Sequence, residues 1–145
     1  MSTEQNKALA RQLVEEVLNK GNMARADEIL APDFVEHEEL PPGMLPDREA
    51  PKQLTAMLRN AFPDFKATIN DLVAEGDKVV IHMTWSGTQQ GEFMGIPPTG
   101  QPISVGVFDI LRIAGGQIVE HWGLTDTMSM MQQLGVMPTP GQGES

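Results

Sequence analysis

The sequence lacks cysteine and tyrosine, and its 10 lysines and arginines face 20 aspartates and glutamates. Without cysteine, disulfide bonds and thiolate chemistry are excluded. The formal net charge of −10 argues against binding to nucleic acid or anionic lipid, because phosphate groups require a basic patch. Apolar runs stay well below the roughly 18 residues of a membrane span, and the polar N-terminal region has no apolar signal-peptide core. We therefore predict a cytoplasmic protein with no nucleic-acid or membrane partner.

The sequence motifs of nucleotide binding and of serine hydrolases are also missing. The chain has no glycine-rich loop of the dinucleotide or P-loop type, and the Gly-x-Ser-x-Gly pattern of serine hydrolases is absent. Its three histidines, His37, His82 and His121, are far apart, and His37 lies between two glutamates on a segment expected to be extended, where neighbouring side chains diverge. We predict neither a nucleotide cofactor nor a bound metal.

The composition is that of one globular domain. Of the 145 residues, 40% are hydrophobic and 21% are charged, and no internal repeat or linker divides the chain. We place the domain at residues 1–137 and a flexible tail at 138–145. The ten methionines suit either a methionine-rich core or the adaptable apolar walls of a binding site.

The first half of the chain has helical periodicity. Apolar residues at helical spacing predict helices over residues 3–20, 23–30 and 51–62. Ser2 or Thr3 can cap the first helix, and Pro51 suits the first turn of the third. Between them, residues 34–39 are short and acidic, which favours an edge strand or a bend.

The second half changes to the alternation of strands. Strands are predicted at 65–74, 78–87, 103–113 and 117–123, with turns at 75–77 and 114–116 and a long Gly/Pro-rich loop at 91–102. A short helix then begins at Thr125 or Asp126 and runs through Leu134. Helices followed by hairpin-linked strands predict an α+β fold, with an antiparallel sheet carrying helices on one face. A curved sheet over helices would leave a concave interior that suits a small-molecule pocket.

Two side chains on neighbouring strands are the candidates for proton transfer. Asp109 alternates with Val107 and Leu111, so it either lies on the buried face, where burial would raise its pKa, or points outward. In the outward arrangement Phe108 and Ile110 would be buried instead. His121 is expected to share one face with residues 119 and 123, and residues 118, 120 and 122 the other. It either relays a proton from Asp109 or is a core histidine satisfied by one hydrogen bond.

Three other residues allow two interpretations each. Asp126 is either a helix N-cap or a further acid. Trp85 and Trp122 are packing residues or platforms for a ligand, and packing is the more frequent role.

Three stretches of the chain resemble the SnoaL-like polyketide cyclases, also called ester cyclases. They are the first helix with the following segment 26–37 (ADEILAPDFVEH), the loop 91–100 (GEFMGIPPTG), which is the most specific, and 116–122 (GQIVEHW). The likeness covers residues 5–137. It implies a cone-shaped, nuclear-transport-factor-2-like α+β barrel, in which helices fill the concave side of a bent antiparallel sheet. It further implies homodimers packed sheet to sheet, and cofactor-free aldol ring closure of a small apolar or aromatic polyketide-like molecule.

The resemblance also implies where the site lies. The acid–base aspartate of the cyclases aligns with Gly123, and a second pocket position aligns with Asp109. The implied catalytic residues are then Asp109 with His121, and Asp126 as a second substitute. The predicted substrate contacts are His37, His82, Trp85, Phe93, Met94 and Trp122.

Three functions remain open on the sequence alone. The first is an enzyme of aldol-type ring closure or of a related cyclisation, isomerisation or hydrolysis. The second is a ligand-binding protein of the same fold that has lost catalysis, which Gly123 at the aspartate position favours. The third is a plain dimerisation module, supported by fold analogy alone.

Overall fold

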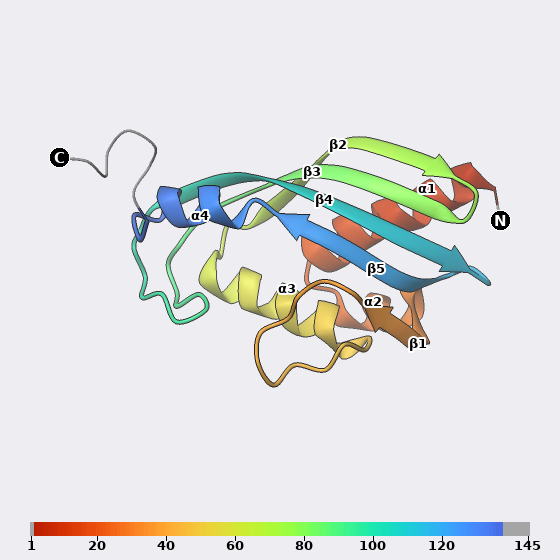
Figure 1. Ribbon diagram of the computed structural model, residues 1–145, viewed down its shortest axis with the longest axis horizontal. Helices are drawn as coiled ribbons and strands as arrows, with labels where there is room; N and C mark the ends of the chain where they lie inside the picture. The colour runs from red at the N-terminus through yellow and green to blue at the C-terminus, as the bar shows by residue number, and fades with distance from the viewer. Residues whose placement is uncertain (1, 138–145) are drawn as a thin grey trace.

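A five-stranded sheet in the order β1-β5-β4-β3-β2 is the frame of the computed structural model, which describes residues 2–137 (Figure 1). The strands are β1 (Leu30–Glu36), β2 (Lys66–Glu75), β3 (Lys78–Thr88), β4 (Pro102–Ala114) and β5 (Gln117–Thr125). The helices are α1 (Thr3–Gln12) with its π-helical continuation η1 (Leu13–Leu18), α2 (Met23–Ile29), α3 (Glu49–Ala61) and α4 (Thr127–Gln133). The predicted tail at 138–145 lies outside the described residues. Within residues 2–137, none of the helices is both long and apolar enough to cross a membrane.

The α+β fold class is confirmed, and the sheet is mixed rather than wholly antiparallel. Strands β2, β3, β4 and β5 pair antiparallel, but β1 runs parallel to β5. The direction of β1 follows from α2, because the strand begins at the residue after this helix and enters the sheet opposite Ile118, near the start of β5. β1 also begins earlier than expected and includes Pro32. Proline has no backbone N–H to donate, and an edge strand tolerates this because one of its two sides has no neighbouring strand.

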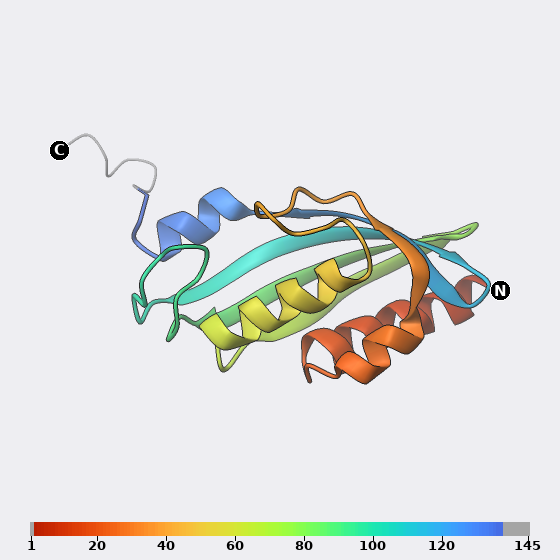
Figure 2. The same cartoon turned by 90° about the horizontal axis from the view of Figure 1, so that it is seen from below.

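The helices α1, α2 and α3 lie on one side of the sheet (Figure 2). Ser2 begins α1 with a capping box, in which its hydroxyl accepts from the Gln5 backbone and the Gln5 side chain accepts from the Ser2 backbone. The predicted helix over 3–20 is divided into α1 and η1, and Gly21 follows with a φ of +68°. The core lies between the helices and the sheet. Its largest fully buried side chains include Phe62, Ile29, Leu30, Ile81, Met83 and Leu111.

Alternation along the central strands sets which side chains face inward. In β4, Val105, Val107 and Leu111 are buried, as their period of two predicts. The same expectation is wrong at the start of β5. Arg112 pairs with Glu120 and Ile113 with Ile118, so one extra residue between Ile118 and Glu120 forms a β-bulge. The bulge turns Ile118 to the buried side, the side that residues 121 and 123 also face.

Candidate active site

The concave side of the sheet forms one wall of a partly open cavity of about 530 Å³, within the range of about 300–1,000 Å³ that is usual for small-molecule sites. Its walls are mainly apolar and come from η1, α3, α4, the inner face of the sheet and two loops. They include Leu13, Phe34, Leu58, Trp85, Phe93 and Met130. Among the polar residues in these walls are Glu36, Glu38, Asp109 and His121, which come from β1, the segment after it, β4 and β5.

His121 is held between two carboxylates. Its Nε2 lies 3.0 Å from Asp109 Oδ1, and its Nδ1 is hydrogen-bonded to Glu36 Oε2. The Glu36 side chain is 1% exposed and that of His121 15%. Burial by itself would lower the pKa of His121, but the charge of Asp109 and the hydrogen bonds to Asp109 and Glu36 outweigh burial and raise the pKa to about 10. The ring is therefore an imidazolium at neutral pH, with each N–H donated to a carboxylate.

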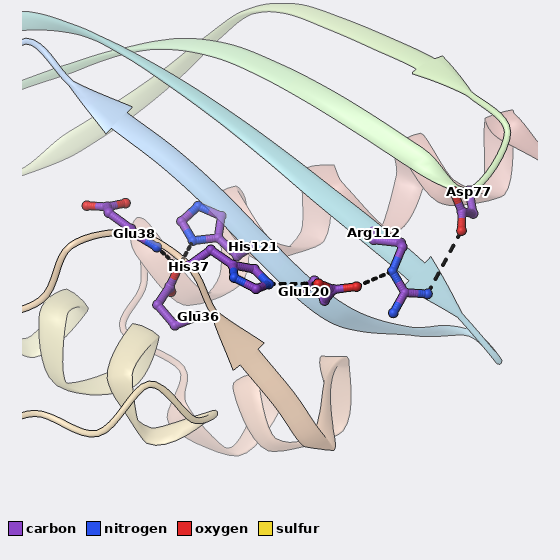
Figure 3. Close-up of polar contacts among 7 residues, drawn as sticks. All are labelled: Glu36, His37, Glu38, Asp77, Arg112, Glu120 and His121. Atoms are coloured by element: carbon purple, nitrogen blue, oxygen red, sulfur yellow. Dashed lines mark hydrogen bonds and ion pairs between the residues drawn. The ribbon is translucent and has the colours of Figure 1, made fainter.

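Glu38 lies beside this group, two residues after Glu36, and Figure 3 shows Glu36, Glu38 and His121 together. The backbone N–H of Glu38 donates to Glu36 Oε2 at 3.2 Å. Burial raises the pKa of the Glu38 carboxyl to about 7. The charge of His121 opposes this rise, and the negative charges of Asp109 and Glu36 add to it.

Gly123 provides the space in which these side chains meet. A Cβ atom added at this position would lie 2.6 Å from Asp109 Oδ1 and 2.9 Å from His121 Cε1, and it would collide with Glu38 Oε1. Real Cβ atoms essentially never come so close to another heavy atom. Any larger residue at 123 would displace one of the carboxylates.

Five of the residues predicted for the site line this cavity. They are Asp109, His121, Trp85, Phe93 and Met94. Asp109 is 8% exposed whereas Phe108 is 54% exposed and Ile110 37%, so the outward arrangement of Asp109 is wrong. His121 makes two polar contacts rather than the single hydrogen bond expected of a core histidine.

Three of the predicted substrate contacts, His37, His82 and Trp122, are not among the residues that line the cavity. His37 stacks on Trp122 with ring centroids 4.7 Å apart and contacts Glu120 Oε2 at 2.7 Å. His82 stacks on Phe108 at 4.4 Å. Strand alternation is the reason. His37 follows Glu36 and Trp122 follows His121, and both preceding residues face the cavity. His82 pairs across the sheet with Phe108, which precedes the inward-facing Asp109.

Asp126 also lies outside the cavity walls. It is the N-cap of α4, where its Oδ1 accepts a hydrogen bond from the backbone N–H of Ser129 at 3.1 Å. The capping interpretation of the sequence therefore describes its contacts.

Sequence reasoning missed Glu36 and Glu38. Adjacent side chains of this segment do diverge, but Glu36 at the end of β1 and Glu38 in the bend that follows it both line the cavity. The glutamates on either side of His37 are the sequence signal that could have indicated this part of the site. What the sequence did not reveal was that the parallel pairing of β1 with β5 sets Glu36 opposite His121.

By distance alone, Glu36, Glu38 and His121 could surround a metal ion, because one oxygen or nitrogen atom from each lies within 4.8 Å of the others. In the structure both ring nitrogens of His121 already contact carboxylates, Nδ1 that of Glu36 and Nε2 that of Asp109. The arrangement suits the holding and transfer of protons.

Comparison with known proteins identifies the family of the chain. Residues 8–134 match the family model described as SnoaL-like polyketide cyclase. Nogalonic acid methyl ester cyclase of Streptomyces nogalater is 28% identical over 119 residues, which cover 81% of this chain and 88% of the relative.

Solved structures with the same fold include TsrD of Streptomyces laurentii, with a TM-score of 0.85 and 30% identity over 94% of this chain and 99% of that one. IdmH of Streptomyces antibioticus has a TM-score of 0.79 and 37% identity over 91% of this chain and 99% of its own. The chain thus belongs to the SnoaL-like polyketide cyclase family.

Proposed function

We propose that this protein is a cofactor-free acid–base enzyme that closes a carbon ring in a small polyketide-like molecule by intramolecular aldol addition. The observation that carries the proposal is the 3.0 Å contact between His121 Nε2 and Asp109 Oδ1 in the wall of a largely apolar cavity. The relationship to a nogalonic acid methyl ester cyclase supports a methyl ester of this kind as the first substrate to try.

The reaction asks for two proton transfers and no external reactant. One proton leaves a carbon atom that is flanked by carbonyl groups, and one proton reaches the oxygen of the carbonyl that this carbon attacks. The product is an isomer of the substrate, so nothing is oxidised and no group leaves. We assign the first step to Asp109, whose carboxylate accepts the carbon-bound proton.

His121 has a positioning and electrostatic role in this mechanism. Its two N–H groups are engaged by Glu36 and Asp109, so the ring fixes the direction of the Asp109 carboxylate. Its positive charge lies in the cavity wall and would stabilise the negative charge of an enolate oxygen bound next to it, because such fixed charges stabilise a transition state without reorganisation.

The apolar walls complete the proposal. Trp85 and Phe93 offer flat surfaces for an aromatic ring, and the surrounding aliphatic side chains limit the shapes that a flexible chain can take. Holding the two reacting carbon atoms close together supplies much of the rate of an intramolecular reaction.

The test is turnover of nogalonic acid methyl ester, with the ring-closed isomer detected by chromatography and NMR. We expect wild type to form this isomer above the buffer background, and Asp109→Asn to lower kcat by about 100-fold or more. Asp33→Asn is the control, because Asp33 is an exposed carboxylate on the same edge of the sheet and is not among the cavity-lining residues. Tight binding of the ester without any turnover would contradict the proposal and favour the ligand-binding alternative.

We further propose that two copies pair through the outer face of the sheet. Exposed Phe108 and Ile110 support this, together with Trp122, which pairs with Ile110 across β4 and β5. Sedimentation analysis should give the mass of a dimer for wild type and of a monomer for Phe108→Lys; a wild-type monomer at high micromolar concentration would contradict it.

A further inference from the structure

The Glu38 side chain occupies space that is available because residue 123 is a glycine. Glu36 and Glu38 both face the cavity, while His37 between them turns to the outer side. Glu38 is fixed through its backbone N–H to Glu36 Oε2, at 3.2 Å. Its carboxyl oxygen Oε1 reaches the strand position of Gly123, in the same small volume as Asp109 Oδ1.

The glycine at 123 is explained by this carboxyl group together with its neighbours Asp109 and His121, and not by the backbone. Gly123 is not among the glycines with a positive φ, so an ordinary L-residue could adopt its backbone conformation. The obstacles are the side chains of Glu38, Asp109 and His121, because a Cβ atom would collide with Glu38 Oε1 and would also lie within 3.0 Å of the other two. Gly106 on β4 provides the contrast, because it too has no positive φ and a Cβ there would meet nothing within 4 Å. The space at 123 is therefore specific to the group of carboxylates.

The net charge of Glu36, Glu38, Asp109 and His121 favours a proton on one of the three carboxylates. Glu36, Glu38 and Asp109 face one imidazolium, that of His121, and Glu39 lies at the exposed rim of the cavity. With the three inner carboxylates ionised, these four side chains would carry two net negative charges in a largely apolar wall, which is unfavourable. Glu36 and Asp109 are held by the imidazolium, and Glu38 is the member without a cation directly bonded to it.

We propose that Glu38 is the catalytic acid of the same reaction, delivering a proton to the attacked carbonyl oxygen from the space that the missing side chain at 123 leaves free. This inference rests on the proposed ring closure. It supplies the second proton transfer, which Asp109 and His121 do not provide.

The step balances without a further reactant. As the new carbon–carbon bond forms, the π electrons of the attacked carbonyl move to its oxygen, and the O–H bond of Glu38 breaks to protonate that oxygen. Asp109 has by then taken the proton from the carbon nucleophile. After the product leaves, that proton passes from Asp109 to Glu38, which shares the volume beside Gly123, and both groups return to their starting forms. The raised pKa of Glu38, about 7, means that it holds a proton through much of the neutral range.

The test compares wild type with Glu38→Gln on nogalonic acid methyl ester, with Asp33→Asn as the control carboxylate. Glutamine keeps the shape of the side chain but has no proton to transfer, so we expect kcat to fall by about 100-fold with little change in KM. Wild-type kcat should decrease as the pH rises through about 7, and the residual activity of Glu38→Gln should lack this decrease. Wild-type turnover in Glu38→Gln, or an unchanged pH profile, would overturn the inference and leave the proposed function intact.

A measurement without substrate separates the two proposals. In protein with ¹³C-labelled glutamate carboxyl groups, the resonance that disappears in Glu38→Gln should titrate near pH 7. Titration near the ordinary value of 4.5 would overturn the role of Glu38, whether or not the ester is turned over. A resonance that titrates near 7 in a protein that closes no ring would refute the proposed function, and the assignment of Glu38 as an acid for that reaction would fail with it.

Discussion

Replacing Glu38 with glutamine should change how the stability of the fold depends on pH. The carboxyl group has a pKa of about 7 in the folded protein against 4.5 as the ordinary value. Between these values the folded state holds a proton that the unfolded state has released. The stabilisation is therefore complete below pH 4.5 and is lost as the pH rises to about 7.

The size of this effect follows from the difference between the two pKa values. At about 1.36 kcal/mol for each pH unit, the difference corresponds to a ceiling of about 3 kcal/mol. Glu38 is only partly buried, and solvent screening reduces the expected loss to about 1–2 kcal/mol. Glu38→Gln has no ionisation at this position, so its free energy of unfolding should stay flatter from pH 4.5 to 7.

The assay is urea denaturation followed by tryptophan fluorescence at closely spaced pH values, with Asp33→Asn as the control. His121 does not confuse the result, because its pKa is raised from 6.5 to about 10; its stabilisation is complete below pH 6.5 and is lost mainly at alkaline pH. Glu38→Gln should retain that alkaline loss. Parallel stability curves of wild type and Glu38→Gln between pH 4.5 and 7 would refute the reasoning.

Three further predictions concern single positions. Gly123→Ala should lower stability by about 1–3 kcal/mol because its Cβ collides with Glu38, whereas Gly106→Ala, with open space around it, should be neutral within about 0.5 kcal/mol in the same denaturation assay. Asp126→Ala should cost about 1 kcal/mol through loss of the α4 cap and leave kcat on nogalonic acid methyl ester unchanged; a large loss of kcat would restore Asp126 as a catalytic candidate. Asp109→Asn should bind the ester in a calorimetric titration with a Kd within roughly threefold of wild type, since the proposed role of Asp109 is proton transfer, and a much weaker Kd would argue for a binding role.

The hairpin-linked strands were predictable because their signals are local. In β4 the period of two in Val105, Val107 and Leu111 places Asp109 on the same face as these residues, although the sequence left open which of the two faces is buried. The turn at residues 115–116 likewise uses glycines with positive φ, a conformation that most other residues avoid.

The features that the sequence predicted wrongly or not at all depend on pairing between segments that are distant in the chain. The bulge between Ile118 and Glu120 is set by register against β4, so local alternation assigned Ile118 to the wrong face. The acidic pair of Glu36 and Glu38 becomes part of the site only because β1 pairs parallel to β5, which no local pattern indicates. His37 was the residue of that segment chosen as a site candidate because of its imidazole, but strand alternation places it away from the cavity, where it stacks on Trp122.

The replacement of an aspartate by Gly123 also has a different meaning in three dimensions. From the sequence, this glycine suggested a lost catalytic group or one that had moved to Asp109. The structure brings a carboxylate from the segment that follows β1, that of Glu38, to the same place. A missing side chain at one position was therefore not evidence that the site lacks an acid.

The most direct test of acid–base catalysis by this cavity is the rate of ring closure of nogalonic acid methyl ester by purified protein, measured with a metal chelator present from pH 5 to 9. The account predicts formation of the ring-closed isomer without any added cofactor, with kcat decreasing as the pH rises through about 7. No product at any pH, or product only when a metal ion or nucleotide is added, would contradict it.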